Sequence, residues 1–119
     1  MDNTVQKWLD GYVSAWRSND PDEIRALFTE DGTYAGSPLQ EKPVAGVDNI
    51  VAWWLKNKDD VGEWTFEAKP IAFSDGVGVI EGYTVYGNEG HEYANLWVVH
   101  FAEDGRATSF VEWALAPGH

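Results

Sequence analysis

The sequence contains no cysteine, which excludes disulfide bridges, thiol nucleophiles and thiolate metal ligands. It contains no run of about 20 apolar residues, the length that a helix needs to cross a bilayer. The first residues are acidic and polar, without the basic segment and apolar core of a secretory signal. We therefore expect a cytoplasmic protein without membrane contact, and its 119 residues suffice for a single domain over residues 1–119.

Basic residues are also scarce, since 8 Lys and Arg stand against 20 Asp and Glu and the net charge is −12. Such a surface repels phosphate backbones, so we expect no nucleic-acid partner. His91, His100 and His119 lie at a predicted hairpin, on a predicted strand and at the terminus, a distribution that does not suggest a metal site. The sequence has no nucleotide-binding loop and no nucleophile elbow, so we expect neither metal nor cofactor.

Aromatic residues, by contrast, are abundant, with seven tryptophans and 14% aromatic residues in total. An aromatic surface of this size must face a core, a ligand or a partner. The aromatic positions are therefore candidate site positions.

The first half of the chain predicts helices. Apolar residues at three- and four-residue steps predict a helix from Thr4 to Ser18. Asp20 is a natural N-cap for a second helix, with Pro21 at its first position and Glu23 in place for a capping box. The remaining predictions, in order, are a second helix that carries Phe28 and stops before residue 31, a strand at 33–34, a loop over 37–45, and a third helix that begins near Gly46.

The second half predicts strands, because apolar and polar residues alternate from Trp64 onward. Asp75-Gly76 and Asp104-Gly105 are signals for two-residue turns, and residues 88–90 suit a three-residue hairpin loop. The predicted strands span 64–73, 77–86, 91–102 and 106–115. Helices followed by strands indicate an α+β domain, an antiparallel meander with helices on one face.

A set of motifs runs along nearly the whole chain: Tyr12-x3-Trp16, Asp20-Pro21, Leu27-Phe28-x2-Asp31, Tyr34, Gly46-x3-Ile50, Trp53-Trp54, Asn95-Leu96-Trp97, Phe101, Asp104-Gly105-Arg106 and Glu112-Trp113. By these motifs the sequence resembles the nuclear transport factor 2-like superfamily, and within it the SnoaL-like group, which includes polyketide cyclases and ketosteroid isomerases. The resemblance implies an α+β, cone-shaped fold with three N-terminal helices packed on a curved antiparallel sheet. It implies no single activity, because one scaffold carries isomerases, dehydratases, cyclases and non-enzymes.

The ketosteroid isomerase motif can be laid along this chain. By this resemblance, the catalytic tyrosine falls on Tyr12, the general-base aspartate on Gly36, and the protonated aspartate on or near Trp97. A glycine cannot take a proton, and a tryptophan offers only one N–H donor. We therefore do not expect this chain to isomerise steroids by that mechanism.

The predicted turns indicate which strand residues share a face. The turn at 104–105 pairs Trp97 with Glu112, and the loop at 88–90 pairs Glu81 with Trp97. These three side chains then form one row on the more aromatic face, which the resemblance directs toward the helices and the pocket. A slip of one residue would turn either glutamate out to solvent.

The two glutamates of this row have two interpretations. Desolvation would raise the pKa of a buried Glu112 or Glu81, as a general acid or base requires. Alternatively, each makes a structural hydrogen bond to a Tyr, a Trp or a helix cation such as Arg17, Arg25 or Lys56. Asp31 is a third acid–base candidate, for which turn capping is the alternative.

The predicted pocket is lined by aromatic side chains and one amide, namely Tyr12, Trp16, Phe28, Tyr34, Trp53, Trp54, Tyr83, Asn95, Trp97 and Phe110. We expect a small hydrophobic ligand there. Two hypotheses remain, an enzyme for cofactor-free isomerisation, dehydration or cyclisation, and a non-catalytic ligand-binding or protein-interaction module.

The other face of the predicted sheet is also apolar, carrying Ile71, Ile80, Tyr86, Leu96, Val98, Val111 and Trp113. An open sheet with this much apolar surface usually packs against a partner. We therefore expect a homodimer through this convex face.

Overall fold

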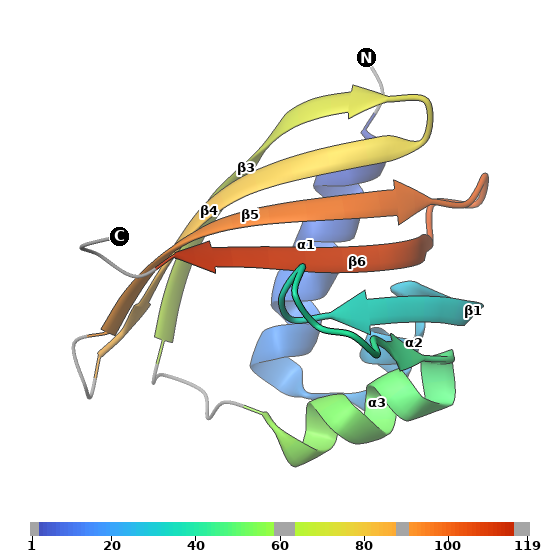
Figure 1. Cartoon of the computed structure of the whole chain (residues 1–119), viewed down its shortest axis with the longest axis horizontal. Coiled ribbons are helices and arrows are strands. Elements are labelled where there is room, and N and C mark those ends of the chain that lie inside the picture. The colour runs from blue at the N-terminus through green and yellow to red at the C-terminus, as the bar shows by residue number, and fades with distance from the viewer. Residues whose placement is uncertain (1–2, 59–63, 88–90, 116–119) are drawn as a thin grey trace.

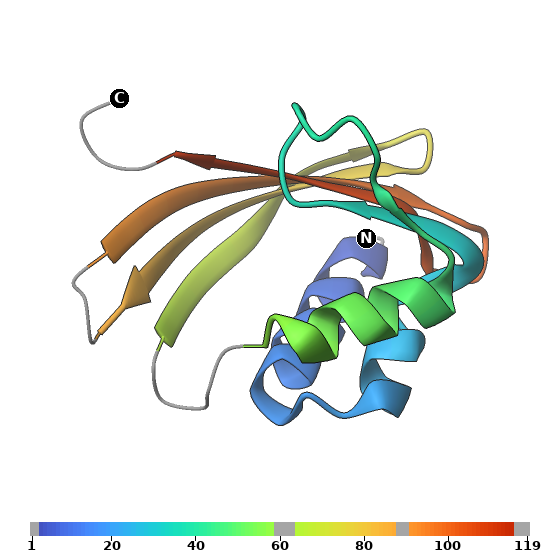
Figure 2. The ribbon, with the colours of Figure 1, turned by 60° about the horizontal axis from the view of Figure 1, so that its bottom comes forward.

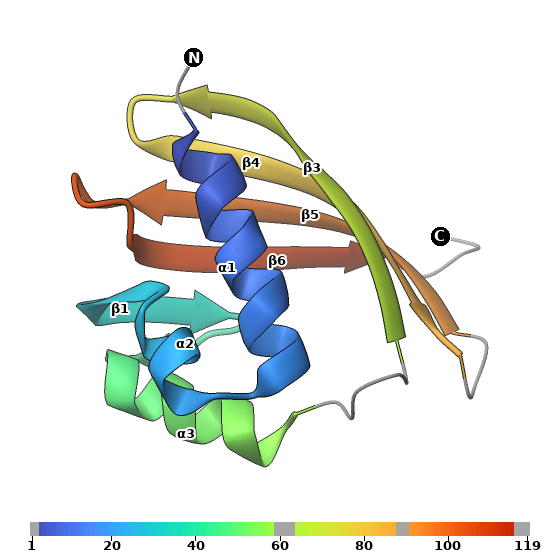
Figure 3. The ribbon, with the colours of Figure 1, turned by 180° about the vertical axis from the view of Figure 1, so that it is seen from behind.

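The computed structural model describes residues 3–58, 64–87 and 91–115. Its elements, in chain order, are α1 (Thr4–Ser18), α2 (Pro21–Arg25), β1 (Phe28–Ala35), β2 (Val44–Ala45), α3 (Val47–Lys56), β3 (Trp64–Ser74), β4 (Val77–Tyr86), β5 (His91–Phe101) and β6 (Ala107–Leu115). The strands form one curved sheet in the order β2-β1-β6-β5-β4-β3 (Figure 1). The helices lie together on one side of it (Figures 2 and 3), which confirms the predicted α+β fold.

Helix α1 has the predicted bounds and crosses the inner face of the sheet (Figure 3). Its buried side chains are Val5, Trp8, Leu9, Tyr12 and Ala15, which recur at the three- and four-residue steps seen in the sequence. None of the helices in the described ranges is long and apolar enough to cross a membrane.

Helix α2 begins as predicted but is only five residues long. The Asp20 side chain accepts a 2.8 Å hydrogen bond from the backbone N–H of Asp22, which confirms the N-cap. The predicted capping box does not form. The Glu23 carboxylate instead accepts hydrogen bonds from the hydroxyls of Ser14 and Ser18, and the Ser18 hydroxyl accepts one from the backbone N–H of Asp20.

The segment from Phe28 to Glu30 is strand, so the prediction that helix two continues up to residue 31 is wrong. Strand β1 pairs in parallel with β6, beginning with Phe28 opposite Ala107, and the Ala107 N–H donates to the Leu27 carbonyl at 2.8 Å. This pairing joins segments about 80 residues apart in the chain. Helix propensity depends only on nearby residues, so it carries no information about such a remote partner.

The two Asp-Gly turns differ. Asp75 and Gly76 both have positive φ, 53° and 78°, which confirms the predicted two-residue turn. At the other turn, Gly105 has φ 88° and the Ala102 N–H donates to the Arg106 carbonyl, so the loop has three residues instead of two. An irregularity next to it, between His100 and Phe101, restores the predicted register, and Trp97 does stand opposite Glu112.

The register predicted between β4 and β5 is wrong by one residue. The ladder places Ile80 opposite Trp97 and Glu81 opposite Leu96. The predicted loop at 88–90 lies outside the described residues, but the residues that pair on either side of it, Tyr86 and His91, are one residue farther apart in the chain than that loop required. The slip exchanges the two faces of β4, the error to which a strand of period two is prone.

Two glycines of β4 let neighbouring layers approach. A Cβ at Gly82 would lie 2.7–2.8 Å from the Phe66 ring, so its absence lets that ring cover β4 and stack on Trp97, with centroids 5.0 Å apart. A Cβ at Gly78 would lie 2.8 Å from both Phe101 and Val5, where α1 meets the sheet. The inner face of the sheet is therefore an aromatic core shaped by small residues.

Candidate functional site

The predicted pair Trp97 and Glu112 is the centre of a hydrogen-bonded network on the inner face. The Trp97 Nε1–H and the Asn95 Nδ2–H each donate to Glu112 Oε2 at 2.8 Å. The Thr84 hydroxyl donates in turn to Asn95 Oδ1 at 2.7 Å, which orients the amide. Three neighbouring strands, β4, β5 and β6, thus hold one carboxylate in place.

Glu112 is partly buried, and no Lys or Arg among the described residues forms a salt bridge with it. Desolvation raises its pKa above the ordinary value, while the hydrogen bonds from Trp97 and Asn95 act in the opposite direction. Within the described part of the chain, no other donor reaches this carboxylate, so Oε1 accepts no hydrogen bond there. The geometry is that of a desolvated carboxylate with one oxygen fixed and one available.

Tyr12 lies beside this network on α1. Its ring centroid is 4.5 Å from that of Trp97, and its hydroxyl forms a 3.2 Å hydrogen bond with the hydroxyl of Tyr34. Burial raises the pKa of Tyr12 well above its usual value, and the charges of Tyr34 and Glu112 raise it further. Tyr12 is therefore a neutral hydroxyl that can donate a hydrogen bond.

Six of the predicted pocket residues belong to the buried core, namely Tyr12, Phe28, Tyr34, Trp54, Trp97 and Phe110, and the last two and Phe28 are almost completely enclosed. Phe28 and Phe110 are 0% exposed and Trp97 is 2% exposed. Each is enclosed by other rings, for example Trp97 by Tyr12, Phe66 and Phe110. These side chains position the site but present almost no surface to a ligand.

The tryptophans of α1 and α3 lie around the same region. Trp54 donates from Nε1 to Asn19 Oδ1 at 3.1 Å and contacts Tyr12, with ring centroids 5.0 Å apart. Trp53 is partly exposed, and its ring centroid is 4.8 Å from that of Tyr34. Trp16 stacks on Trp64 at 3.7 Å. Trp16 and Trp54 thus contact Tyr12 directly, and Trp53 contacts its hydrogen-bond partner Tyr34.

Glu81, Tyr83 and Asp31 do not join the site. Because of the slipped register, Glu81 and Tyr83 lie on the outer face, where Tyr83 is 43% exposed. The prediction that they share a face with Trp97 is wrong. Asp31 is exposed on β1, which also removes its predicted place at a helix end.

Three residues of the site were not predicted. Thr84 and Phe66 face inward and contact Asn95 and Trp97, respectively. Trp64 is buried against Trp16, and its Nε1–H has no hydrogen-bond partner among the residues that the structure describes. The alternation of apolar and polar residues along 64–68 could have predicted that Trp64 and Phe66 face inward. The inward position of Thr84 could be predicted only from the observed pairing of β4 with β5. No cluster of His, Asp or Glu suited to a metal ion occurs among the residues that the structure describes.

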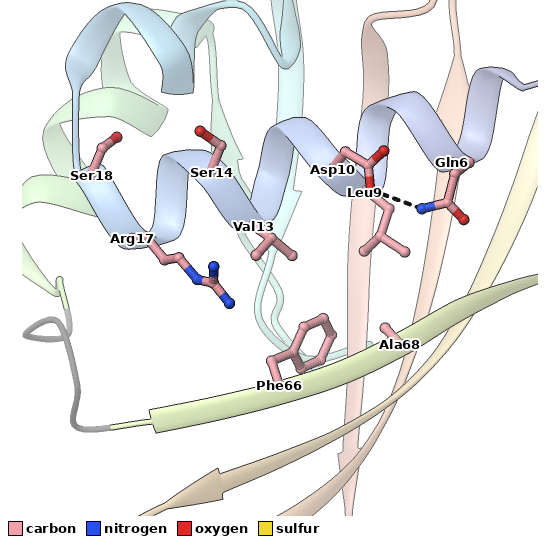
Figure 4. A pocket seen from close by; sticks show the side chains of 9 residues that line it. All are labelled: Gln6, Leu9, Asp10, Val13, Ser14, Arg17, Ser18, Phe66 and Ala68. Carbon is pink, nitrogen blue, oxygen red and sulfur yellow. Dashed lines mark hydrogen bonds between the residues drawn. The ribbon is translucent and has the colours of Figure 1, made fainter.

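A separate groove of about 540 Å³ lies between α1 and the edge strand β3 (Figure 4). A second cleft, of about 440 Å³, lies between the N-terminal half of α1 and the turn between β5 and β6. Neither groove was predicted from the sequence.

Comparison with known proteins places the fold in a family. The model of the SnoaL-like domain matches residues 9–110. No curated protein matches the sequence. An NTF-2 like protein from Burkholderia xenovorans has 15% identity and a TM-score of 0.77, over 98% of this chain and 87% of that one.

Two further structures are similar at low identity, so the likeness concerns the fold alone. A ketosteroid isomerase-like protein from Erwinia carotovora has 17% identity and a TM-score of 0.66, over 96% of this chain and 95% of that one. An LEH-like epoxide hydrolase from M. tuberculosis has 16% identity and a TM-score of 0.67, over 92% of this chain and 80% of that one. The family match covers most of the chain, and the fold agrees with it along nearly the whole length. This chain belongs to the SnoaL-like domain family.

Proposed function

We propose that this SnoaL-like domain binds a small hydrophobic molecule beside the aromatic inner face of its sheet and that Glu112 is its acid–base group. The observation that carries the proposal is the state of Glu112, a desolvated carboxylate held by two N–H donors and by no cation of the described chain. A buried acid without a cation is costly to maintain, and such groups are concentrated at functional sites.

The geometry of Glu112 suits proton transfer. Trp97 and Asn95 fix Oε2, so Oε1 is the atom that would take a proton from a ligand or return one. A raised pKa brings a carboxyl group closer to neutral pH, where both of its protonation states can take part. Tyr12, neutral over the same range, would donate a hydrogen bond to an oxygen that gains charge. This set supports isomerisation, dehydration or cyclisation without a cofactor.

The solved relatives support this reaction class but not one substrate. One is described as ketosteroid isomerase-like and another as an epoxide hydrolase. By the resemblance to ketosteroid isomerases, the two aspartates of that motif fall on Gly36 and on or near Trp97, so the chain lacks them at those positions. Any acid–base chemistry here would therefore run through Glu112, which that motif does not include.

The proposal is tested by a matched pair of substitutions. Glu112→Gln keeps an acceptor for Trp97 and Asn95 but removes the proton-transferring group, while Glu81→Gln makes the same change on the exposed outer face. We expect ligand that co-purifies with the protein, identified by mass spectrometry, to bind both variants. Turnover of that ligand, or of small unsaturated ketones and epoxides, should fall at least about a hundredfold in Glu112→Gln alone.

Two outcomes would decide against catalysis by Glu112. Equal turnover by wild type and Glu112→Gln would remove the glutamate from the mechanism. Binding of the co-purified molecule with no turnover by wild type would favour the non-catalytic module, in which the bonds from Trp97 and Asn95 serve only to satisfy a buried carboxylate.

We also propose that two copies of the chain associate through the outer face of the sheet. Tyr83, Trp113 and Leu115 are 43%, 48% and 55% exposed there, and half-buried Leu96, Val98 and Val111 lie on the same face. Ile80 and Tyr86 do not contribute, because the true register turns them inward. Burial of this surface would remove a large apolar area from water.

A further inference from the structure

The groove between α1 and β3 is built like a binding site, although the proposed function does not use it. Its floor is apolar, formed by Leu9 and Val13 from the helix and by Phe66 and Ala68 from the strand (Figure 4). Its rim is polar and consists of Gln6, Asp10, Ser14, Arg17 and Ser18. The volume of about 540 Å³ lies in the range of small-molecule sites.

The groove is distinct from the surroundings of Glu112. It uses Leu9, Val13 and Arg17 of α1, whereas the network around Glu112 meets the same helix at Tyr12. The Phe66 ring lines the groove and also stacks on Trp97 and contacts Trp16, with centroids 5.0 and 5.3 Å away. Phe66 therefore forms a wall between the groove and the aromatic core.

The charges along the groove are ordered. Arg17 extends from α1 toward β3 (Figure 4), and no carboxylate of the described chain forms an ion pair with it. This is notable in a chain with 20 acidic and 8 basic residues. Asp10 lies about two helical turns away, or about 10 Å, and accepts a 2.8 Å hydrogen bond from Gln6 Nε2. The groove thus has Arg17 at one end, an apolar middle and Asp10 at the other end. The Glu23 carboxylate does not line the groove but accepts hydrogen bonds from the rim hydroxyls of Ser14 and Ser18.

We propose that this groove binds a small amphipathic carboxylate. The carboxylate pairs with the Arg17 guanidinium, whose planar donors match both oxygens of such a group. The apolar body lies on Val13, Phe66 and Ala68. Asp10 repels a carboxylate at the opposite end, so the ligand has one orientation.

Three probes of equal chain length test the charge preference, namely octanoate, octanol and octylamine. Each is titrated into the full chain while amide chemical shifts are followed by NMR. We expect octanoate to shift the amides of Val13, Arg17 and Phe66 saturably and to bind more tightly than octanol or octylamine. Arg17→Gln should weaken octanoate binding about tenfold, the loss of one charge-assisted contact, and leave octanol binding unchanged.

Two further variants separate the proposed contact from general charge effects. Arg17→Lys keeps the positive charge at the end of the helix but not the planar donors, so it should retain part of the octanoate affinity. Lys7→Gln removes one positive charge from the same helix outside this groove, and it should leave the affinity unchanged.

The proposal is overturned if octanoate binding to the groove does not saturate, or if Lys7→Gln weakens octanoate binding as much as Arg17→Gln does. It is also overturned if the shifted amides are those of Asn95 and Glu112, since the carboxylate would then occupy the inner site. Loss of turnover in Glu112→Gln does not bear on this groove, so the two proposals fail separately.

Discussion

Trp97 and Glu112 stand directly opposite each other on β5 and β6, and the indole N–H of Trp97 donates a 2.8 Å hydrogen bond to the carboxylate. This bond stabilises the ionised form and lowers the pKa of Glu112 against the effect of burial. Trp97→Phe removes the donor and leaves Asn95 in place. We expect the pKa of Glu112 to rise further, and stability to fall by about 1–3 kcal/mol, as measured by carboxyl NMR titration and by urea unfolding.

Trp8→Phe is the matched control, because the indole of Trp8 donates to the Leu27 carbonyl instead, also at 2.8 Å. It should lower stability without changing the titration of Glu112. An unchanged pKa in Trp97→Phe would show that the hydrogen bond does not act on the charge of Glu112.

Burial of Glu112 also predicts how stability depends on pH. The raised pKa means that the folded protein holds this proton more tightly than the unfolded chain does. The contribution of Glu112 to stability is therefore complete below its ordinary pKa and is lost as pH rises through the raised one. Glu112→Gln removes this loss, so the variant should gain in melting temperature relative to wild type as the pH rises above the ordinary pKa of a glutamate, about 4.3.

Thermal unfolding of wild type, Glu112→Gln and Glu81→Gln over this pH range provides the measurement. Glu81→Gln changes an exposed side chain and should follow the wild-type curve. If the melting temperatures of wild type and Glu112→Gln differ by the same amount at every pH, the proton on Glu112 is not linked to folding.

Gly82→Ala tests the close approach of Phe66 to β4. The added Cβ would lie 2.7–2.8 Å from the Phe66 ring and would push it away from Trp97. We expect a loss of about 1–3 kcal/mol in the free energy of unfolding, as for other overpacked cores. Gly87→Ala adds the same methyl group to open space and should change stability by less than about 0.5 kcal/mol. Equal effects of the two variants would mean that the core absorbs the methyl group freely.

Trp113→Asp tests the proposed dimer. The side chain is 48% exposed on the outer face of the sheet, where a charge would oppose burial against a second copy. Sedimentation should show a dimer for wild type at micromolar concentration and a monomer for the variant. Ala52→Asp adds the same charge to exposed α3 and should stay dimeric. A wild type that sediments only as a monomer would contradict the association.

Local patterns in the sequence predicted most of the helices and strands and two of the three residues expected in the row that contains Glu112. The bounds of α1 and the positive-φ turn at Asp75-Gly76 follow from periodicity and turn chemistry. The opposition of Trp97 and Glu112 was predicted from a two-residue turn at 104–105, and it holds because an irregularity between His100 and Phe101 offsets the extra residue of the actual loop. The parallel pairing of β1 with β6 does not, because its partners are remote in the chain. Propensity therefore extended helix two into residues that the sheet uses as a strand.

The two faces of β4 show why the register could not be predicted. One face carries Val77, Val79, Glu81, Tyr83 and Val85, and the other carries Gly78, Ile80, Gly82, Thr84 and Tyr86. Both are mixtures of apolar and polar residues, so alternation alone does not select the inner one. The packing of the folded protein selects the inner face, because the Phe66 ring lies where a Cβ would clash and Gly82 is the residue beneath it.

By itself, the sequence determined that this chain forms helices followed by strands, that its core is aromatic, and that Glu112 shares a face with Trp97. These features depend on neighbours along the chain or across one short turn. The tertiary structure decided that Glu81 faces away, that Asn95 and Thr84 complete the network around Glu112, and that α1 and β3 form a groove with Arg17 at one end. Each of these depends on how layers pack at a distance in sequence, where the fit of side chains, and not periodicity, sets the free energy.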